Sequence, residues 1–229
     1  MEFSDKWKIK KIDEIANVVG GGTPKTNVEK YWNGNINWFT PSEIGTKKYI
    51  KTSKRKITES GLKNSSAHLI PKFSILLSSR ATIGETSICL TETTTNQGFQ
   101  SLIPKNSINN EFLYYLILTK KHELIRKSSG STFLEISKKE IKQLKIKLPS
   151  FNEQKKISNL LSSIDFKIDL LNENYLKYIH FKKGLLQQIF KEGAKKLQFK
   201  KENWKKITLG DIGVFYRGHR YNKENVANT

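Results

Sequence analysis

The sequence predicts an α+β fold: one mixed α/β domain, then a long α-helix that forms a coiled coil with another helix, from a second copy of the domain or from a second chain. Three observations lead to this prediction. Residues 1–148 mix short β-like runs with one amphipathic helix. Residues 149–193 instead carry a nearly unbroken heptad pattern. Residues 194–229 contain a segment that repeats the beginning of the chain.

The start of the domain is predicted to alternate between short elements and turns. An amphipathic run over residues 12–19 stops at the Gly-Gly-Gly-Thr-Pro sequence of residues 20–24. Three glycines before Thr-Pro indicate a sharp turn or an open loop. Asn33-Gly34 is a strong turn signal between two aromatic-rich runs, so we expect a β-hairpin there.

The rest of the domain adds strands and one convincing helix. Residues 68–80 read as a turn that leads into a buried strand, and 87–90 and 99–103 as further strands. Asn110 is expected to cap a helix over 110–125, because apolar residues follow it at helical spacing. An alternating apolar run over 141–148 ends at Pro149.

The second part of the chain has the periodicity of a coiled coil. Its apolar residues alternate in spacings of four and three, with Lys182 in the one gap and no proline or glycine before Gly184. A helix over 152–190 would be about 57 Å long, too long to fold back into its own domain. The predicted dimerisation residues are Ile157, Leu161, Ile164, Ile168, Leu171, Tyr175, Tyr178, Leu185 and Ile189. The alternative is a single core helix of a bundle.

The end of the chain restarts its opening in the same register. Trp7, Ile12, Ile15, Val18 and Gly21 align with Trp204, Leu209, Ile212, Phe215 and Gly218, all at one offset. A period this long is not a solenoid repeat, which recurs every ~20–50 residues. It predicts a duplicated domain whose second copy has only begun. The alternative, a coincidence between two amphipathic segments, is disfavoured because the acids Glu14 and Asp211 also align.

Charge indicates a polyanionic partner. The chain has 41 Lys and Arg against 21 Asp and Glu, a formal net charge of +20, and such an excess favours binding to phosphates. The alternative explanation for this excess of basic residues is the amino-acid composition typical of proteins from AT-rich genomes.

Cys89 is the only cysteine, so an intrachain disulfide and a thiolate zinc site are excluded. With no signal peptide and no apolar stretch near ~20 residues, we expect a soluble cytoplasmic protein.

Common catalytic motifs are missing. No two prolines are adjacent, so the Pro-Pro motif of amino-methyltransferases is absent, as is the Pro-Asp pair of restriction nucleases. No Gly-Lys pair exists, which excludes a Walker A phosphate loop. The four histidines lack ligand spacing, so we expect no metal site. A single-chain nuclease or modification enzyme is therefore disfavoured.

Taken together, the motifs resemble the specificity subunit of type I restriction-modification systems. The resemblance covers essentially the whole chain in order. It rests on the opening Trp7…Ile12…Ile15, on residues 21–24 and 31–38, on Ile70-Pro71, on 79–84 and 95–98, on 130–132, and on Leu148-Pro149…Glu153-Gln154…Ile157. The chain departs from the usual family member in having one complete unit.

The resemblance implies a fold and a function. It implies a target recognition domain over 1–148, a helical spacer and dimerisation region over 149–193, and a linker with the start of a second recognition domain over 194–229. The long helix would form an antiparallel coiled coil with a second copy of the chain, and the two chains would read a symmetric bipartite site in double-stranded DNA. Methyltransferase subunits would use S-adenosylmethionine to methylate adenine, and a motor-nuclease subunit would use ATP and Mg²⁺. The chain itself would bind no cofactor. A structural coiled-coil adaptor without sequence-specific DNA binding is the alternative.

Candidate DNA contacts fall into two groups. For phosphate contacts we select cations in or beside loops: Lys25, Lys47, Lys48, Lys54, Arg55 and Lys56. For base contacts we select Thr40, Ser79, Arg80, Asn96, Gln97, Ser131 and Thr132, because Arg suits guanine and Asn or Gln suits adenine. The alternatives are a solvated basic face for the lysines, an ion pair for Arg80 and a turn for Asn96. Tyr31, Trp32 and Trp38 are predicted to be core side chains rather than base-stacking platforms.

Overall fold

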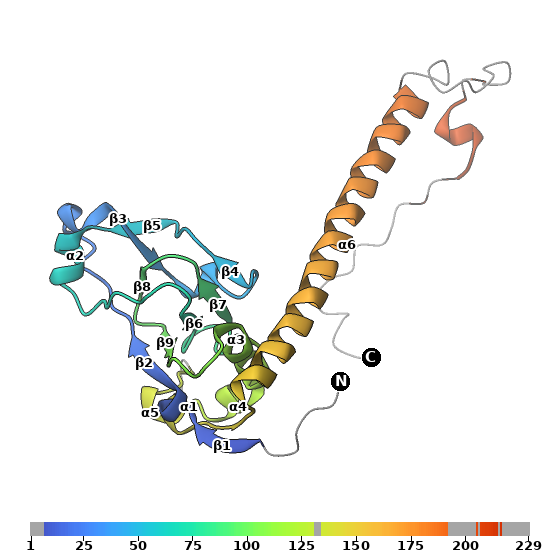
Figure 1. The fold of residues 1–229 in the computed structure, drawn as a ribbon. Helices are drawn as coiled ribbons and strands as arrows, with labels where there is room; N and C mark the ends of the chain where they lie inside the picture. Colours follow the sequence, from blue (N-terminus) through green and yellow to red (C-terminus); the bar gives the residue numbers. More distant parts are fainter. Residues whose placement is uncertain (1–6, 131–133, 192–204, 206, 215, 217–229) are drawn as a thin grey trace, which may run out of the picture. The chain divides into compact units, whose positions relative to one another are not determined.

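The computed structural model describes residues 7–130, 134–191, 205, 207–214 and 216. It divides into two compact units, residues 1–166 and 167–229. Figure 1 shows a first unit built of small sheets and short helices, and the long helix α6 (Phe151–Lys191). The predicted fold class, a mixed α/β domain plus a long helix, is confirmed. The two units divide within α6, whereas the predicted boundary at 148/149 falls just before that helix.

The main core surrounds a five-stranded sheet. Its strands in spatial order are β2 (Ala16–Gly20), β9 (Gln100–Pro104), β6 (Ile75–Leu77), β7 (Thr86–Cys89) and β4 (Tyr49–Ile50), antiparallel except for the β4–β7 pair. Successive side chains of β6 point to opposite faces, and both faces are covered: Ile75 joins one apolar cluster and Leu76 another. The predicted buried strand in 68–80 is therefore confirmed.

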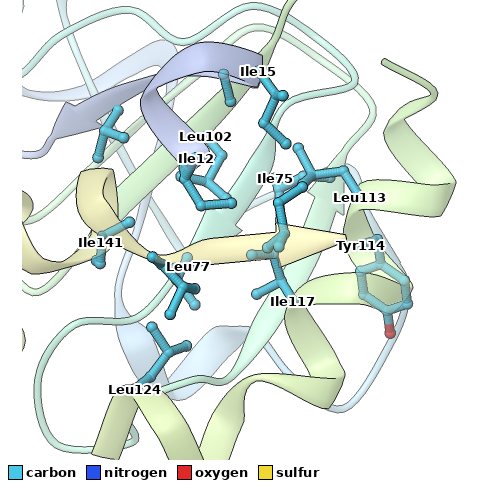
Figure 2. Close-up of a cluster of buried hydrophobic side chains, with 14 of the residues drawn as sticks. Ile12, Ile15, Ile75, Leu77, Leu102, Leu113, Tyr114, Ile117, Leu124 and Ile141 are labelled. Atoms are coloured by element: carbon cyan, nitrogen blue, oxygen red, sulfur yellow. The ribbon is translucent and has the colours of Figure 1, made fainter. Parts of the chain in front are cut away.

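Short helices close one face of this sheet. They are α1 (Ile12–Ile15), α3 (Asn110–Thr119), α4 (Lys121–Arg126) and α5 (Lys138–Gln143). Figure 2 shows their apolar side chains meeting those of the sheet, with Ile12, Leu102, Leu113 and Ile141 all fully buried. A two-stranded sheet of β1 (Lys8–Lys11) and β10 (Lys145–Leu148) joins the beginning of the domain to its end.

A second, three-stranded sheet corrects the predicted hairpin. Its order is β5 (Arg55–Ile57), β3 (Trp32–Phe39), β8 (Thr93–Thr95), and helix α2 (Glu59–Lys63) follows β5. Strand β3 runs through Asn33-Gly34 instead of turning. Its pairing with β5 shifts register between Trp32 and Ile36, and Asn33 has a φ of 61°. The turn signal therefore marks a β-bulge, which also uses a residue with positive φ.

Two further sequence predictions need correction. The predicted helix over 110–125 is two helices, because the Lys120 amide donates to the Ile117 carbonyl at 2.9 Å, a three-residue step that ends α3. Its cap is Asn109, whose side chain accepts from the Phe112 amide at 2.8 Å. The run 141–148 is not one strand: α5 extends to Gln143, and β10 begins at Lys145.

The first turn of α6 is attached to the domain by side chains. Ser150 and Glu153 form a capping pair, with the Ser150 hydroxyl donating to Glu153 Oε2 at 2.9 Å. Gln154 is 1 % exposed, and its amide bridges two segments. Its Oε1 accepts from the Asn109 amide at 2.9 Å, and its Nε2 donates to the Pro149 carbonyl at 3.1 Å. Gln154 thus ties the start of α6 to the start of α3.

A polar network attaches the next turns of α6. The Lys48 ammonium donates to Ser162 Oγ at 2.7 Å, to Tyr115 Oη at 3.0 Å and to Glu111 Oε2 at 3.2 Å. Ser162 donates to the same Glu111 oxygen at 2.6 Å, and Tyr115 donates to Asp165. Polar groups in a partly buried network are costly to leave unpaired, so each member holds the others in place. The network joins the loop before β4, helix α3 and helix α6.

The second unit contains a local repeat of the first. A short 3₁₀ turn over Leu209–Asp211 is capped by Asp211, which accepts from the Thr208 amide at 2.7 Å. In the first unit, Glu14 accepts from the Lys11 amide at 2.7 Å at the matching position before α1. The repeat seen in the sequence therefore extends to local structure. The repeat positions Trp204, Phe215 and Gly218 lie outside the described residues.

No helix in the described part of the chain is long and apolar enough to cross a membrane.

The polar network predicts a pH-dependent stability. Burial raises the pKa of Glu111, but hydrogen bonds from Ser162, Tyr49 and Lys48 outweigh it and hold the pKa below the ordinary value of a glutamate, 4.5. A carboxyl group whose pKa is lower in the folded than in the unfolded chain stabilises the fold at pH values above its unfolded pKa. This stabilisation is lost as the pH falls through its folded pKa. Glu111→Gln should therefore lower the urea midpoint at pH 7, and this difference should shrink below pH ~4.5. The control is Glu92→Gln at an exposed site; an equal effect there, or a pH-independent effect of Glu111→Gln, would contradict the assignment.

Candidate nucleic-acid interface

The glycine turn packs directly against the loop that follows β8. The Gly22 amide donates to the Thr95 carbonyl at 2.8 Å, and Thr23 Oγ1 donates to Gln97 Oε1 at 2.5 Å. A Cβ on Gly21 would lie 2.0 Å from the Asn96 carbonyl oxygen. The backbones approach too closely for a side chain, which explains the glycine at this position.

A third loop joins this pair through Thr40 and Glu43. The Asn96 amide donates to the Phe39 carbonyl at 3.0 Å, which places Thr40 beside the Asn96 loop. Thr40 Oγ1 donates to Glu43 Oε2 at 2.7 Å, and Glu43 Oε1 accepts from the Lys54 amide at 2.7 Å. One carboxylate therefore connects the loop after β3 to the cationic segment that contains β5.

A fourth loop joins at Gly98. The Ser79 amide donates to the Gly98 carbonyl at 2.8 Å, and the Ile136 amide donates to the Ser79 carbonyl at 3.1 Å. Arg80 is half-exposed and forms an ion pair from Nε to Glu135 Oε2 at 2.8 Å. The ion pair uses Nε and orients the guanidinium. The structure therefore brings Thr40, Asn96, Gln97 and Arg80 to adjoining loops, which we call the loop edge.

Arg55 lies on an aromatic platform next to this edge. Its guanidinium carbon is 3.6 Å from the centroid of the Trp32 ring and 5.4 Å from that of Trp38. Trp32 is 8 % and Trp38 4 % exposed, so both are core side chains, as predicted. The two indoles meet edge to face, with centroids 5.1 Å apart. Lys54 and Lys56 flank Arg55 in the chain, and Lys54 is exposed.

Several predicted contact residues lie elsewhere. Lys48 is only 12 % exposed, and its amine is engaged by the network beside α6, so this geometry corrects its assignment as a phosphate contact. Ser79 is fully buried, which removes it from the accessible candidates. Lys47 is exposed but lies next to β7, where its carbonyl accepts from Ser87 Oγ at 2.7 Å. Ser131 and Thr132 lie outside the described residues.

Sequence reasoning missed the side chains that organise the loop edge. Glu43 was not selected, although Thr-Pro-Ser-Glu at residues 40–43 is a capping-box pattern that predicts its contact with Thr40. Glu135 carried no local signal, because it meets Arg80 only through the fold. The described residues contain no group of three or more His, Cys, Asp or Glu that would hold a metal ion.

These features define a class of protein in which a mixed α/β domain, with polar side chains gathered on adjoining loops, continues into a long helix. The family model for the type I restriction modification DNA specificity domain matches residues 4–180. The chain belongs to this family.

Two curated relatives agree with this assignment. The chain is 42 % identical over 189 residues to the type I restriction enzyme MjaIX specificity subunit of Methanocaldococcus jannaschii, a match that covers 81 % of this chain and 43 % of the relative. It is 29 % identical over 184 residues to the EcoR124I/EcoR124II specificity subunit of Escherichia coli, covering 77 % and 45 %. The chain thus spans less than half the length of these relatives.

Solved structures share the fold. The HsdS subunit from Thermoanaerobacter tengcongensis matches with a TM-score of 0.59 at 17 % identity, covering 83 % of this chain and 46 % of that one. The type I restriction-modification S subunit from M. genitalium matches with a TM-score of 0.61 at 17 % identity, covering 98 % and 58 %. A chain from another type I restriction-modification system reaches 0.65 at 21 % identity, covering 82 % and 46 %.

The close approach at Gly21 gives a test of the loop edge. Gly21→Ala should destabilise the domain by about 1–3 kcal/mol, because the added methyl overlaps the Asn96 carbonyl and the loops must separate. The control is Gly184→Ala in α6, where a Cβ meets nothing within 4 Å. That change should be neutral or stabilising by up to about 1 kcal/mol. Urea denaturation measures both; an unchanged Gly21→Ala midpoint would refute the packing described.

Proposed function

We propose that this chain is the DNA-recognition component of a type I restriction-modification complex. It catalyses no step itself and acts in the cytoplasm. Its loop edge selects the DNA sequence at which partner subunits methylate adenine with S-adenosylmethionine or cleave with ATP and Mg²⁺. The observation that carries the proposal is the convergence of Thr40, Asn96, Gln97 and Arg80 on adjoining loops in a chain that belongs to the specificity family. No comparable observation supports the adaptor alternative.

The chemistry of the loop edge fits duplex DNA. The amide oxygens of Asn96 and Gln97 accept from the Gly98 amide and the Thr23 hydroxyl, which leaves their NH2 groups and the Arg80 guanidinium as donors for the acceptors that base pairs present in the major groove. Exposed cations flank these groups: Lys25 follows the glycine turn, and Lys54 precedes β5. Phosphate contacts of this kind set orientation and affinity, whereas base contacts set sequence. The loop edge and the lysines that flank it together supply both kinds of contact.

Helix α6 supports a symmetric assembly. Predicted dimerisation residues along it are largely exposed: Ile168 is 50 %, Leu171 68 %, Tyr175 63 % and Tyr178 73 % accessible. Apolar side chains at heptad spacing are stabilised when a second helix covers them. Two copies of this chain, with their α6 helices antiparallel, would place one recognition domain at each end of the pair. Such a two-fold dimer would read two inverted half-sites at a fixed separation.

The proposed pairing predicts the oligomeric state. Ile168→Lys places a charge in the apolar stripe and should convert a dimer into a monomer in sedimentation velocity runs. The control is Asp169→Lys, which introduces the same side chain one residue along, off the stripe, and should leave the dimer intact. A dimer that survives Ile168→Lys would assign the stripe to another partner.

The function itself is tested by methylation. We expect co-expression of the chain with the modification subunit of its own system to methylate adenines within one split motif, with inverted halves and a constant gap. Sequencing that detects N6-methyladenine measures this, and cells that express the modification subunit alone are the control. Absence of any chain-dependent motif would refute DNA recognition. An asymmetric motif would refute the homodimer alone.

A further inference from the structure

Strands β3 and β5 form an antiparallel ribbon, and the border strand β5 carries two cationic residues, Arg55 and Lys56. Strand β5 lies at the border of its sheet and pairs only with β3, with Trp38 opposite Arg55 and Asn37 opposite Lys56. The major groove of B-DNA is wide enough to admit a two-stranded β-ribbon. Since successive side chains alternate between the two faces of a strand, Arg55 and its neighbour Lys56 point to opposite faces.

Hydrogen bonds hold the two indole rings that contact Arg55. The Trp38 indole nitrogen donates to the Gly22 carbonyl at 2.8 Å, and the Trp32 indole nitrogen donates to the Lys25 carbonyl at 3.2 Å. The Trp38 amide also donates to Ser53 Oγ at 2.9 Å. Both rings are therefore held by hydrogen bonds as well as by burial. The guanidinium lies over the Trp32 ring, with the perpendicular Trp38 ring beside it, and contact with an aromatic face restricts a side chain that otherwise rotates freely.

The edge of the Arg55 guanidinium is available. The residue is exposed, and within the described ranges no carboxylate forms an ion pair with it. Arg80 differs from Arg55 in this respect, because its Nε already forms an ion pair with Glu135. Lys48 differs too, because its amine is enclosed by Glu111, Tyr115 and Ser162. Arg55 therefore combines a restrained orientation with unused donors.

This combination suits a base better than a phosphate. A phosphate contact needs positive charge and tolerates many approach directions, so a flexible lysine provides it. A guanine presents two acceptors, O6 and N7, at one fixed spacing in the plane of the base, and a planar fork matches both at once. A rigid support adds most where two hydrogen bonds must form together.

We propose that Arg55, supported by Trp32 and Trp38, is a guanine-binding side chain that donates two hydrogen bonds to O6 and N7 of one guanine in each half-site. The inference rests on the proposed function and deepens it. It also reassigns Arg55, which the sequence suggested as a phosphate contact, to the reading of base sequence.

The test is selection of bound duplexes from a random DNA pool. The full-length chain is compared with Arg55→Ala, Arg55→Lys and Lys54→Ala. We expect the wild-type chain to select half-sites with one strongly preferred guanine. Both Arg55 variants should lose that preference by about 5- to 150-fold at this one position and keep the others. Arg55→Lys keeps the charge but lacks the fork, so it separates bidentate reading from simple attraction. Lys54→Ala should weaken binding to all duplexes equally and leave the selected sequence unchanged.

Each outcome has a defined meaning. If the wild-type chain selects no sequence, the proposed function fails, and this inference fails with it. If the wild-type chain selects a motif without guanine, or if the Arg55 variants select the wild-type motif, only this inference is overturned. An equal loss of affinity for every duplex would assign Arg55 to phosphate, and a loss of the folded state in both Arg55 variants would assign it to stability. Thermal unfolding of each variant distinguishes the last case.

Discussion

The recognition domain depends on a small set of backbone hydrogen bonds that hold four loops in contact. Gly22 bonds to Thr95, Asn96 to Phe39, and Ser79 to Gly98. These loops come from distant parts of the chain, and without the contacts their flexibility would add an entropy cost to the proposed binding of DNA. Because the contacts are made by main-chain atoms, the side chains that remain exposed are free to differ without loss of the scaffold. Main-chain atoms therefore maintain the fold of the loops, and the exposed side chains remain available for binding.

The same domain also controls where the long helix begins. Gln154 fixes the first turn of α6 through hydrogen bonds to Asn109 and Pro149, and the Lys48 network fixes the turns that carry Ser162 and Asp165. These hydrogen bonds fix the part of α6 that belongs to the first unit. In the proposed dimer this attachment matters for function, because the separation of the two half-sites is set by the helices. A loose joint would allow several separations.

Features with a strong period were predicted well from the sequence, and features that depend on tertiary contacts were not. The heptad pattern predicted α6 within one residue at each end, because its apolar spacing continues over the whole helix. The repeat of the opening segment was visible in sequence and has its counterpart in the caps at Glu14 and Asp211. The Asn33-Gly34 signal was misassigned, because a bulge and a two-residue turn require the same backbone conformation.

In the candidate site, too, some features could be predicted from the sequence and others depend on tertiary contacts. Loop residues such as Thr40, Asn96 and Arg80 were selected by chemical type, and the fold brings them to adjoining loops. Lys48 and Ser79 were selected by the same reasoning and are buried or engaged elsewhere. A sequence shows which side chains can bind DNA, but burial is decided by residues far along the chain, such as Ser162 for Lys48. The aromatic support of Arg55 likewise depends on the register of β3 against β5.

Hydroxyl-radical footprinting of a duplex that carries the methylated motif would test the central claim most directly. The account predicts two protected patches of equal length, related by a two-fold axis and separated by unprotected DNA along the span of the helices. A single continuous patch, or protection that is the same on unrelated DNA, would contradict it.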